Sequence, residues 1–128
     1  MPVPLNNIGP EDLKWMMPPP NSEKWYDGPE DALRKIAAGQ WQLWRIQGDA
    51  KGVLMTYVLD RKLWICYLHG EGVGPTQVKR GAEILTRVVQ RLGLDCVTGL
   101  VHNLALARIY LSLGAKVVEP MQVELGNG

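Results

Sequence analysis

Two kinds of hydrophobic pattern alternate along the chain. In one kind the apolar residues recur every three or four positions, which is typical of an amphipathic helix. In the other they alternate or run together, which is typical of a strand. Helical spacing with matching start and stop residues predicts helices at 10–17, 29–38, 75–92 and 103–114. Strand patterns predict strands at 41–46, 53–59, 63–68, 95–101 and 116–119, and one more beyond Pro120.

The connections between these elements narrow the topology. Asp60-Arg61-Lys62 is short enough to join two of the strands as an antiparallel hairpin. The glycine-rich segment from Gly70 to Gly74 predicts a loop before the longest helix. The apolar face of that helix contains Val78, Ala82, Leu85, Val88, Val89 and Leu92. Helices that alternate with strands in this way predict an α/β fold.

The stretch from Asn103 to Gly114 is central to this order. Asn103 is a favourable N-terminal cap, and Gly114 suits a left-handed C-terminal cap. Tyr110 shares a face with the apolar residues of the stretch, so its ring is predicted to pack inward with the hydroxyl at a polar edge. Strand-like runs stand directly before and after, which predicts a strand, helix, strand unit.

The N-terminal segment, residues 1–28, is predicted to be an arm outside a domain formed by residues 29–128. Seven of the nine prolines stand at or before residue 29. The arm also carries large apolar side chains, at Trp15, Met16, Met17, Trp25 and Tyr26. We expect these to anchor the arm on its own domain; the alternative is a surface that binds a protein partner or a second copy of the chain.

Composition excludes several classes of protein. A chain of 128 residues with 46% hydrophobic and 21% charged residues predicts one globular core. The formal net charge of +1 gives no bulk attraction for nucleic acid or an anionic membrane, so nucleic acid is the least favoured partner. No apolar run is long enough to span a bilayer, and no export signal precedes the first helix.

The cysteines point to a reduced setting. Cys66 and Cys96 both stand in apolar strand-like runs, where a free cysteine behaves as a small hydrophobe. A cytoplasmic location is therefore expected. Together with His69 and His102 they make no recognised zinc pattern, so no metal site is predicted.

The order of elements from about Gln40 to Leu125 resembles the GNAT superfamily of acetyl-CoA-dependent N-acetyltransferases. The most specific match lies in the central stretch. Family members typically read Asn, two residues, Ala, three residues, Tyr, three residues, Gly-Phe. Here Asn103, Leu106, Tyr110 and Gly114 stand at those offsets, with Ala115 in place of Phe. The resemblance implies that Asn103 lies beside acetyl-CoA and that Tyr110 protonates the departing thiolate.

A second family motif is Gln or Arg, two residues, Gly, one residue, then Gly or Ala, in the strand-to-helix loop that cradles the CoA pyrophosphate. The best match runs from Gln77 to Ala82 through Lys79, Arg80 and Gly81. Arg80 stands where glycine is usual, and the glycine is displaced by one position. The resemblance implies that these five residues bind the pyrophosphate and that the Arg80 guanidinium contacts a phosphate directly.

The resemblance also implies a mixed, mostly antiparallel central sheet flanked by helices. Strands 63–68 and 95–101 would splay, and backbone groups near Leu68 would hydrogen-bond the pantetheine amides. Glu71 is the implied catalytic base, either directly or through a water, with His69 as the other candidate at the end of that strand. The acceptor amine is not specified.

The truncated, proline-rich N-terminus and the Trp41-Gln42-Leu43-Trp44 strand also resemble the small GNAT-like proteins of tailed bacteriophages. That resemblance implies the host cytoplasm or the virion as the location. Two functions are therefore expected. One is acetyl transfer from acetyl-CoA to an amine; the alternative is a non-catalytic structural or interaction module of the kind that associates with a phage virion. Nucleic-acid binding through Lys79, Arg80, Arg87 and Arg91 ranks third.

Overall fold

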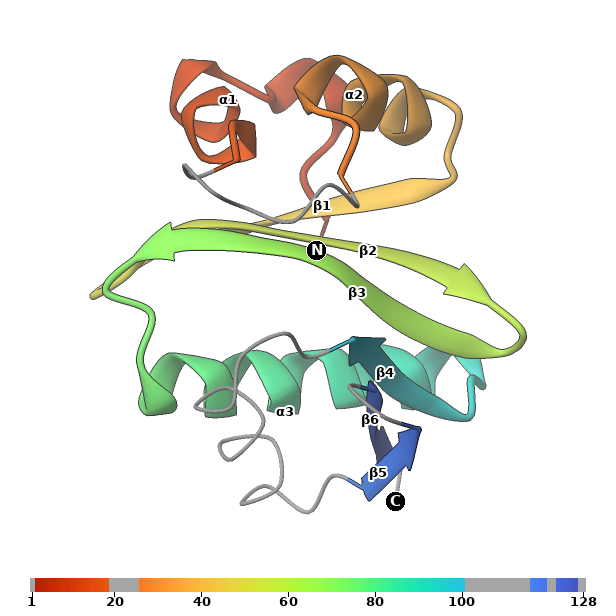
Figure 1. Cartoon of the computed structure of the whole chain (residues 1–128). Coiled ribbons are helices and arrows are strands. Elements are labelled where there is room, and N and C mark those ends of the chain that lie inside the picture. Colours follow the sequence, from red (N-terminus) through yellow and green to blue (C-terminus); the bar gives the residue numbers. More distant parts are fainter. Residues whose placement is uncertain (1, 19–25, 101–115, 120–121, 127–128) are drawn as a thin grey trace. The chain divides into compact units, whose positions relative to one another are not determined.

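A computed structural model of the chain describes residues 2–18, 26–100, 116–119 and 122–126 (Figure 1). The elements in chain order are the short 3₁₀ turn η1 (Leu5–Asn7), α1 (Pro10–Met16), α2 (Pro29–Ala37), β1 (Trp41–Ile46), β2 (Lys51–Leu59), β3 (Lys62–Glu71), α3 (Pro75–Leu92), β4 (Cys96–Leu100), β5 (Lys116–Glu119) and β6 (Gln122–Gly126). The chain divides into two compact units, Met1–Tyr57 with Tyr67–Gly72, and Val58–Cys66 with Val73–Gly128.

The first unit packs α1 and α2 on one side of its strands (Figure 1). β1 pairs antiparallel with β2, from Trp41 opposite Tyr57 to Ile46 opposite Gly52, and β3 lies beside β2. Its buried apolar residues are Trp15, Met16, Ala32, Leu43, Ala50, Val53, Met55 and Tyr67. The alternation predicted for β1 is confirmed at Leu43, which is fully buried while both of its neighbours are partly exposed.

Helix starts in this unit follow local chemistry. Pro10 and Pro29 both occupy the first helical position, where the missing N–H removes no helical hydrogen bond. Glu30 and Asp31 stand in the first turn of α2 and two basic residues in its last turn, the order that the helix dipole favours. The predicted helices at 10–17 and 29–38 are therefore confirmed to within one residue.

The second unit contains a parallel pair within a mixed sheet. β3 runs parallel to β4, from Lys62 opposite Cys96 to Ile65 opposite Gly99. Parallel neighbours need a crossover connection, and α3 supplies it and packs against β4 (Figure 1). β6 pairs antiparallel with both β4 and β5, so the strand order in this unit is β3-β4-β6-β5. The chain is thus a mixed α/β structure.

The turn between β2 and β3 confirms the predicted hairpin. Asp60 and Arg61 both have left-handed backbones, with φ of 53° and 62°, the geometry of a two-residue type I′ turn. The Arg61 Nη2 donates to the Gly93 carbonyl at 2.8 Å, and the Asp95 N–H donates to the Arg61 carbonyl at 2.7 Å. The hairpin is therefore tied to the connection between α3 and β4.

Two expectations change. Gly70 and Glu71 are the last residues of β3, so the predicted loop is shorter and begins at Gly72. A Cβ at Gly52 would lie 2.6 Å from the Gly70 Cα; the two glycines allow a close approach of β2 and β3. Leu92 was expected on the apolar face of α3 but is 60% exposed. Here the helix ends in a Gly93 cap at φ 69°, and its last turn is only partly covered.

The predicted helix at 103–114 lies outside the described residues, as does Pro120. The splay of strands 63–68 and 95–101 concerns residues beyond the ladder that ends at Ile65 and Gly99, and it stays a prediction.

Candidate functional site

The first turn of α3 is built by a proline and a capping glutamine. Gly74 has an extended backbone and precedes Pro75, the first helical residue. The Gly74 N–H donates to the Gln77 Oε1 at 3.0 Å, and the Val78 N–H donates to the Gly74 carbonyl at 3.1 Å. The Gln77 side chain therefore caps the helix start through its oxygen, which leaves its amide nitrogen for other partners.

The predicted pyrophosphate residues lie within this helix. They were expected in the strand-to-helix loop, but Pro75 starts α3 two residues before Gln77, so the whole run from Gln77 to Ala82 is helical. The loop expectation is therefore wrong. Lys79 and Arg80 are exposed, and no acidic residue stands in the first turn. The structure thus places these residues in the first half of α3, with Lys79 to Ala82 beyond its first turn.

Gly81 is not explained by packing among the described residues. A Cβ built on it has no described atom within 4 Å, whereas glycine inside a helix costs about 1 kcal/mol relative to alanine. Ala82, its neighbour, is half-buried, and its carbonyl accepts the Thr86 hydroxyl at 2.7 Å. Around the helix axis Gly81 lies about 40° from Leu85 and about 160° from Lys79, so it stands on the side of the helix that carries the buried residues.

The remaining predicted residues are divided. Glu71, exposed at the end of β3, and Leu68, half-buried in the same strand, belong to the first unit. Tyr110 and Asn103 lie outside the described residues. Their roles stay predictions.

A polar cluster in the first unit surrounds the main-chain carbonyl of Trp15, near the end of α1. The Tyr67 hydroxyl donates to this oxygen at 2.7 Å, and the His69 Nδ1 lies 2.9 Å from it. Because a carbonyl only accepts, Nδ1 must carry a hydrogen, and the neutral ring then presents Nε2 as its acceptor. The Tyr67 hydroxyl also lies 3.4 Å from the His69 Nδ1. Both groups donate to the Trp15 carbonyl, so this contact between two donors is not a hydrogen bond.

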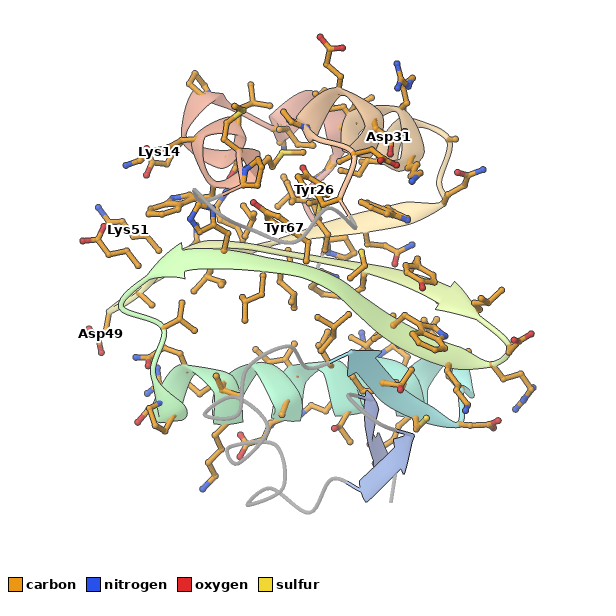
Figure 2. All side chains as sticks on the ribbon, in the orientation of Figure 1. Lys14, Tyr26, Asp31, Asp49, Lys51 and Tyr67 are labelled. Carbon is orange, nitrogen blue, oxygen red and sulfur yellow. The ribbon has the colours of Figure 1, made fainter. Side chains whose placement is uncertain are left out.

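Burial sets the chemistry of this cluster. Loss of solvation raises the pKa of Tyr67 to about 12, so the residue is a neutral phenol at ordinary pH. The Trp15 ring meets His69 edge-on with centroids 5.2 Å apart, and its buried Nε1–H has no partner among the described residues. Figure 2 labels Tyr26 and Tyr67, whose rings pack with centroids 4.4 Å apart.

The contacts of this cluster show how part of the N-terminal segment, residues 1–28, is anchored. Trp15 and Met16 are buried, and the Tyr26 hydroxyl donates to the Met16 carbonyl at 2.9 Å. The expectation that the segment is anchored on its own domain is confirmed for these residues. Met17 is exposed, and Trp25 lies outside the described residues.

Sequence reasoning missed Tyr67. The available signal was its spacing: Tyr67, His69 and Glu71 alternate along β3 and so share one side of the strand. It also missed the ion pair of buried Asp12 with exposed Arg45. The Arg45 Nε and Nη2 donate to the two carboxylate oxygens at 2.8 and 2.6 Å, and the Gly9 N–H donates to the same carboxylate at 3.0 Å.

The ion pair has a structural role. Hydrogen bonding from Arg45 lowers the pKa of Asp12, outweighing the opposing effect of burial. The guanidinium also donates to the Asn7 carbonyl at 3.2 Å. The pair thus fixes the start of α1 and the turn before it to β1.

The described residues contain no group of three or more histidine, cysteine, aspartate or glutamate side chains able to hold a metal ion. Nor is any helix in that part of the chain long and apolar enough to cross a membrane. No protein-family model matches the sequence, and no curated protein matches it either.

Proposed function

We propose that the chain is a GNAT-like N-acetyltransferase that binds acetyl-CoA at the N-terminal half of α3. The observation that carries the proposal is the β3-α3-β4 unit, in which a helix with an exposed cationic start connects two parallel strands. Exposed N–H groups and the dipole at a helix start favour a bound phosphate. The family resemblance supplies the choice of ligand.

The residues of this segment fit a pyrophosphate. Lys79 and Arg80 offer two exposed cations, and the first turn has no carboxylate to repel an anion. In the family, a glycine at this position lets the backbone N–H groups approach the phosphate. Here the Arg80 side chain would bind the phosphate instead, because a guanidinium can donate two hydrogen bonds to it.

Acetyl-CoA would supply the acetyl group and a thiolate leaving group. In the reaction the amine nitrogen forms a bond to the thioester carbonyl carbon, and the carbon–sulfur bond breaks. The resemblance assigns to Tyr110 the proton given to sulfur. It assigns to Glu71, or to a water beside it, the proton taken from the amine.

Calorimetry of the full chain with CoA and with acetyl-CoA tests the proposal. We expect saturable binding, weakened about 10-fold or more by the double substitution Lys79→Gln with Arg80→Gln, because charge-assisted hydrogen bonds are lost. The control is Arg91→Gln, an exposed cation in the last turn of the same helix, which should leave binding unchanged. Absence of binding at millimolar ligand contradicts the proposal, and an equal effect of both variants contradicts the assigned site.

Catalysis requires a second measurement. Tyr110→Phe should lower the rate of acetyl transfer to a panel of amines while acetyl-CoA binding is retained. A chain that binds acetyl-CoA but transfers acetyl to none of these amines would favour the non-catalytic alternative.

A further inference from the structure

The outer face of α3 concentrates positive charge. The helix carries four cations and one carboxylate, in a chain whose formal net charge is only +1. All five side chains are exposed: Lys79, Arg80, Glu83, Arg87 and Arg91. The net charge of the chain is therefore close to zero although α3 carries a local cationic surface.

Three arginines of this set form a line. At about 100° per residue, Arg80, Arg87 and Arg91 lie within about 40° of one another around the helix axis. Along the axis they are spaced by about 10 Å and about 6 Å. We call these three residues the arginine row.

The arginine row is not neutralised within the described part of the chain. Glu83 stands three residues after Arg80 and four before Arg87, the spacings at which helix ion pairs form. Yet neither arginine has an ion pair with it or with any other described residue. A solvated helix surface commonly uses such pairs, whereas here none forms between these arginines and a described residue.

We propose that the arginine row binds the phosphate backbone of a nucleic acid. Guanidinium groups bind phosphates by paired hydrogen bonds. The spacings of about 10 Å and about 6 Å between the arginines correspond to about three and about two phosphates of one strand, counted along the axis of a duplex. A membrane surface fits less well. The apolar side of α3 is buried at Val78, Leu85 and Val89, which leaves only Ile84 and Leu92 as large exposed apolar side chains of the helix.

This inference goes beyond the proposed acetyltransferase function and does not depend on it. Arg80 belongs to both proposed sites. Arg87 and Arg91 belong only to the arginine row, so they are the residues to change.

The test is fluorescence anisotropy of a labelled DNA oligonucleotide, single-stranded and as a duplex, titrated with the full chain between about 50 and 200 mM salt. We expect saturable binding that weakens steeply with salt. The double variant Arg87→Gln with Arg91→Gln should reduce the slope of log K against log salt by about 2. The matched control is Lys14→Gln with Lys51→Gln, which removes the same charge from two exposed residues of the first unit (Figure 2). It should leave the slope unchanged.

Four outcomes overturn the inference: no saturable binding at the lowest salt, no change of slope in the arginine variant, an equal change in the lysine control, or tighter binding to polyglutamate or to phosphatidylserine vesicles than to DNA. Circular dichroism of both variants shows that the fold is retained, which is expected because all four residues are exposed.

Discussion

Asp12 in the first unit and the arginine row in the second use charge in opposite ways. In the first unit Asp12 is buried and its carboxylate is held by a two-point contact with Arg45 and by a backbone N–H. In the second unit the arginine row is exposed and has no ion pair among the described residues. Asp12 is paired and helps to hold the fold together. The arginines of the row form no ion pair with a described residue. Stability and binding are therefore expected to respond to different substitutions.

The largest effect is expected from Asp12→Asn. The substitution weakens the contact with Arg45 at a carboxylate that is only 5% exposed, and we expect a loss of about 2 kcal/mol in the free energy of unfolding. Urea denaturation at neutral pH measures this loss. The comparison fails if the variant is as stable as the parent chain.

The same carboxylate predicts an acid dependence. Because the pKa of Asp12 is lower in the folded chain than its usual 3.8, its contribution is present above that value and is lost as the pH falls through the folded-state pKa. The urea midpoint of the parent chain should therefore fall further below pH 4 than that of Asp12→Asn.

A smaller loss is expected from Tyr67→Phe, which removes one donor to the Trp15 carbonyl while His69 still donates to it. We expect about 1 kcal/mol. The raised pKa of Tyr67 also predicts that stability depends on alkaline pH. The contribution of Tyr67 to the free energy of unfolding is complete below pH 10 and is lost as the pH rises towards about 12. The phenylalanine variant should lack this loss, and an unchanged alkaline profile would refute the assignment.

The substitution Gly81→Ala is expected to increase the free energy of unfolding, because a Cβ meets no described atom there and alanine favours a helix. The increase should be about 0.5–1 kcal/mol. Gly93→Ala is the matched control, since its φ of 69° makes alanine unfavourable and the sign should reverse. If the proposed acetyl-CoA site is right, Gly81→Ala should also weaken acetyl-CoA binding in calorimetry.

The smallest effect should come from the arginine row. Arg87→Gln with Arg91→Gln removes two exposed charges without ion pairs among the described residues, so the free energy of unfolding should change by less than about 0.5 kcal/mol. Thermal denaturation measures it. A large loss of stability would show that these cations hold the fold, as Arg45 does.

Local signals predicted the elements well. The prolines at helix starts and the glycine after α3 fixed three helices to within a residue. The predicted hairpin at 60–62 also formed, because two residues suffice for its turn. The end of β3 was missed because Gly70 favours a loop locally, and only the approach of Gly52 from a neighbouring strand explains it.

The candidate sites were less predictable, for a physical reason. Asp12 meets Arg45 across 33 residues and Tyr67 meets the Trp15 carbonyl across 52, so both contacts depend on how helices dock and not on local spacing. The family motif implied a loop for Gln77 to Ala82 although the local pattern already predicted a helix from Pro75, and the structure follows the local pattern. The arginines of the row were identified in sequence, but side-chain positions were needed to find that they form no ion pair with a described residue.

The first unit is interrupted in sequence, since it comprises Met1–Tyr57 and Tyr67–Gly72. During synthesis the helix that ends at Met16 must therefore wait for more than fifty further residues before Tyr67 and His69 reach the Trp15 carbonyl. Until then Trp15 and Met16 lack part of their native cover, and such exposed apolar side chains favour association between incomplete chains. The contacts of Tyr67 and His69 with the Trp15 carbonyl are therefore among the last of this unit to become available as the chain emerges, after the ion pair of Asp12 with Arg45.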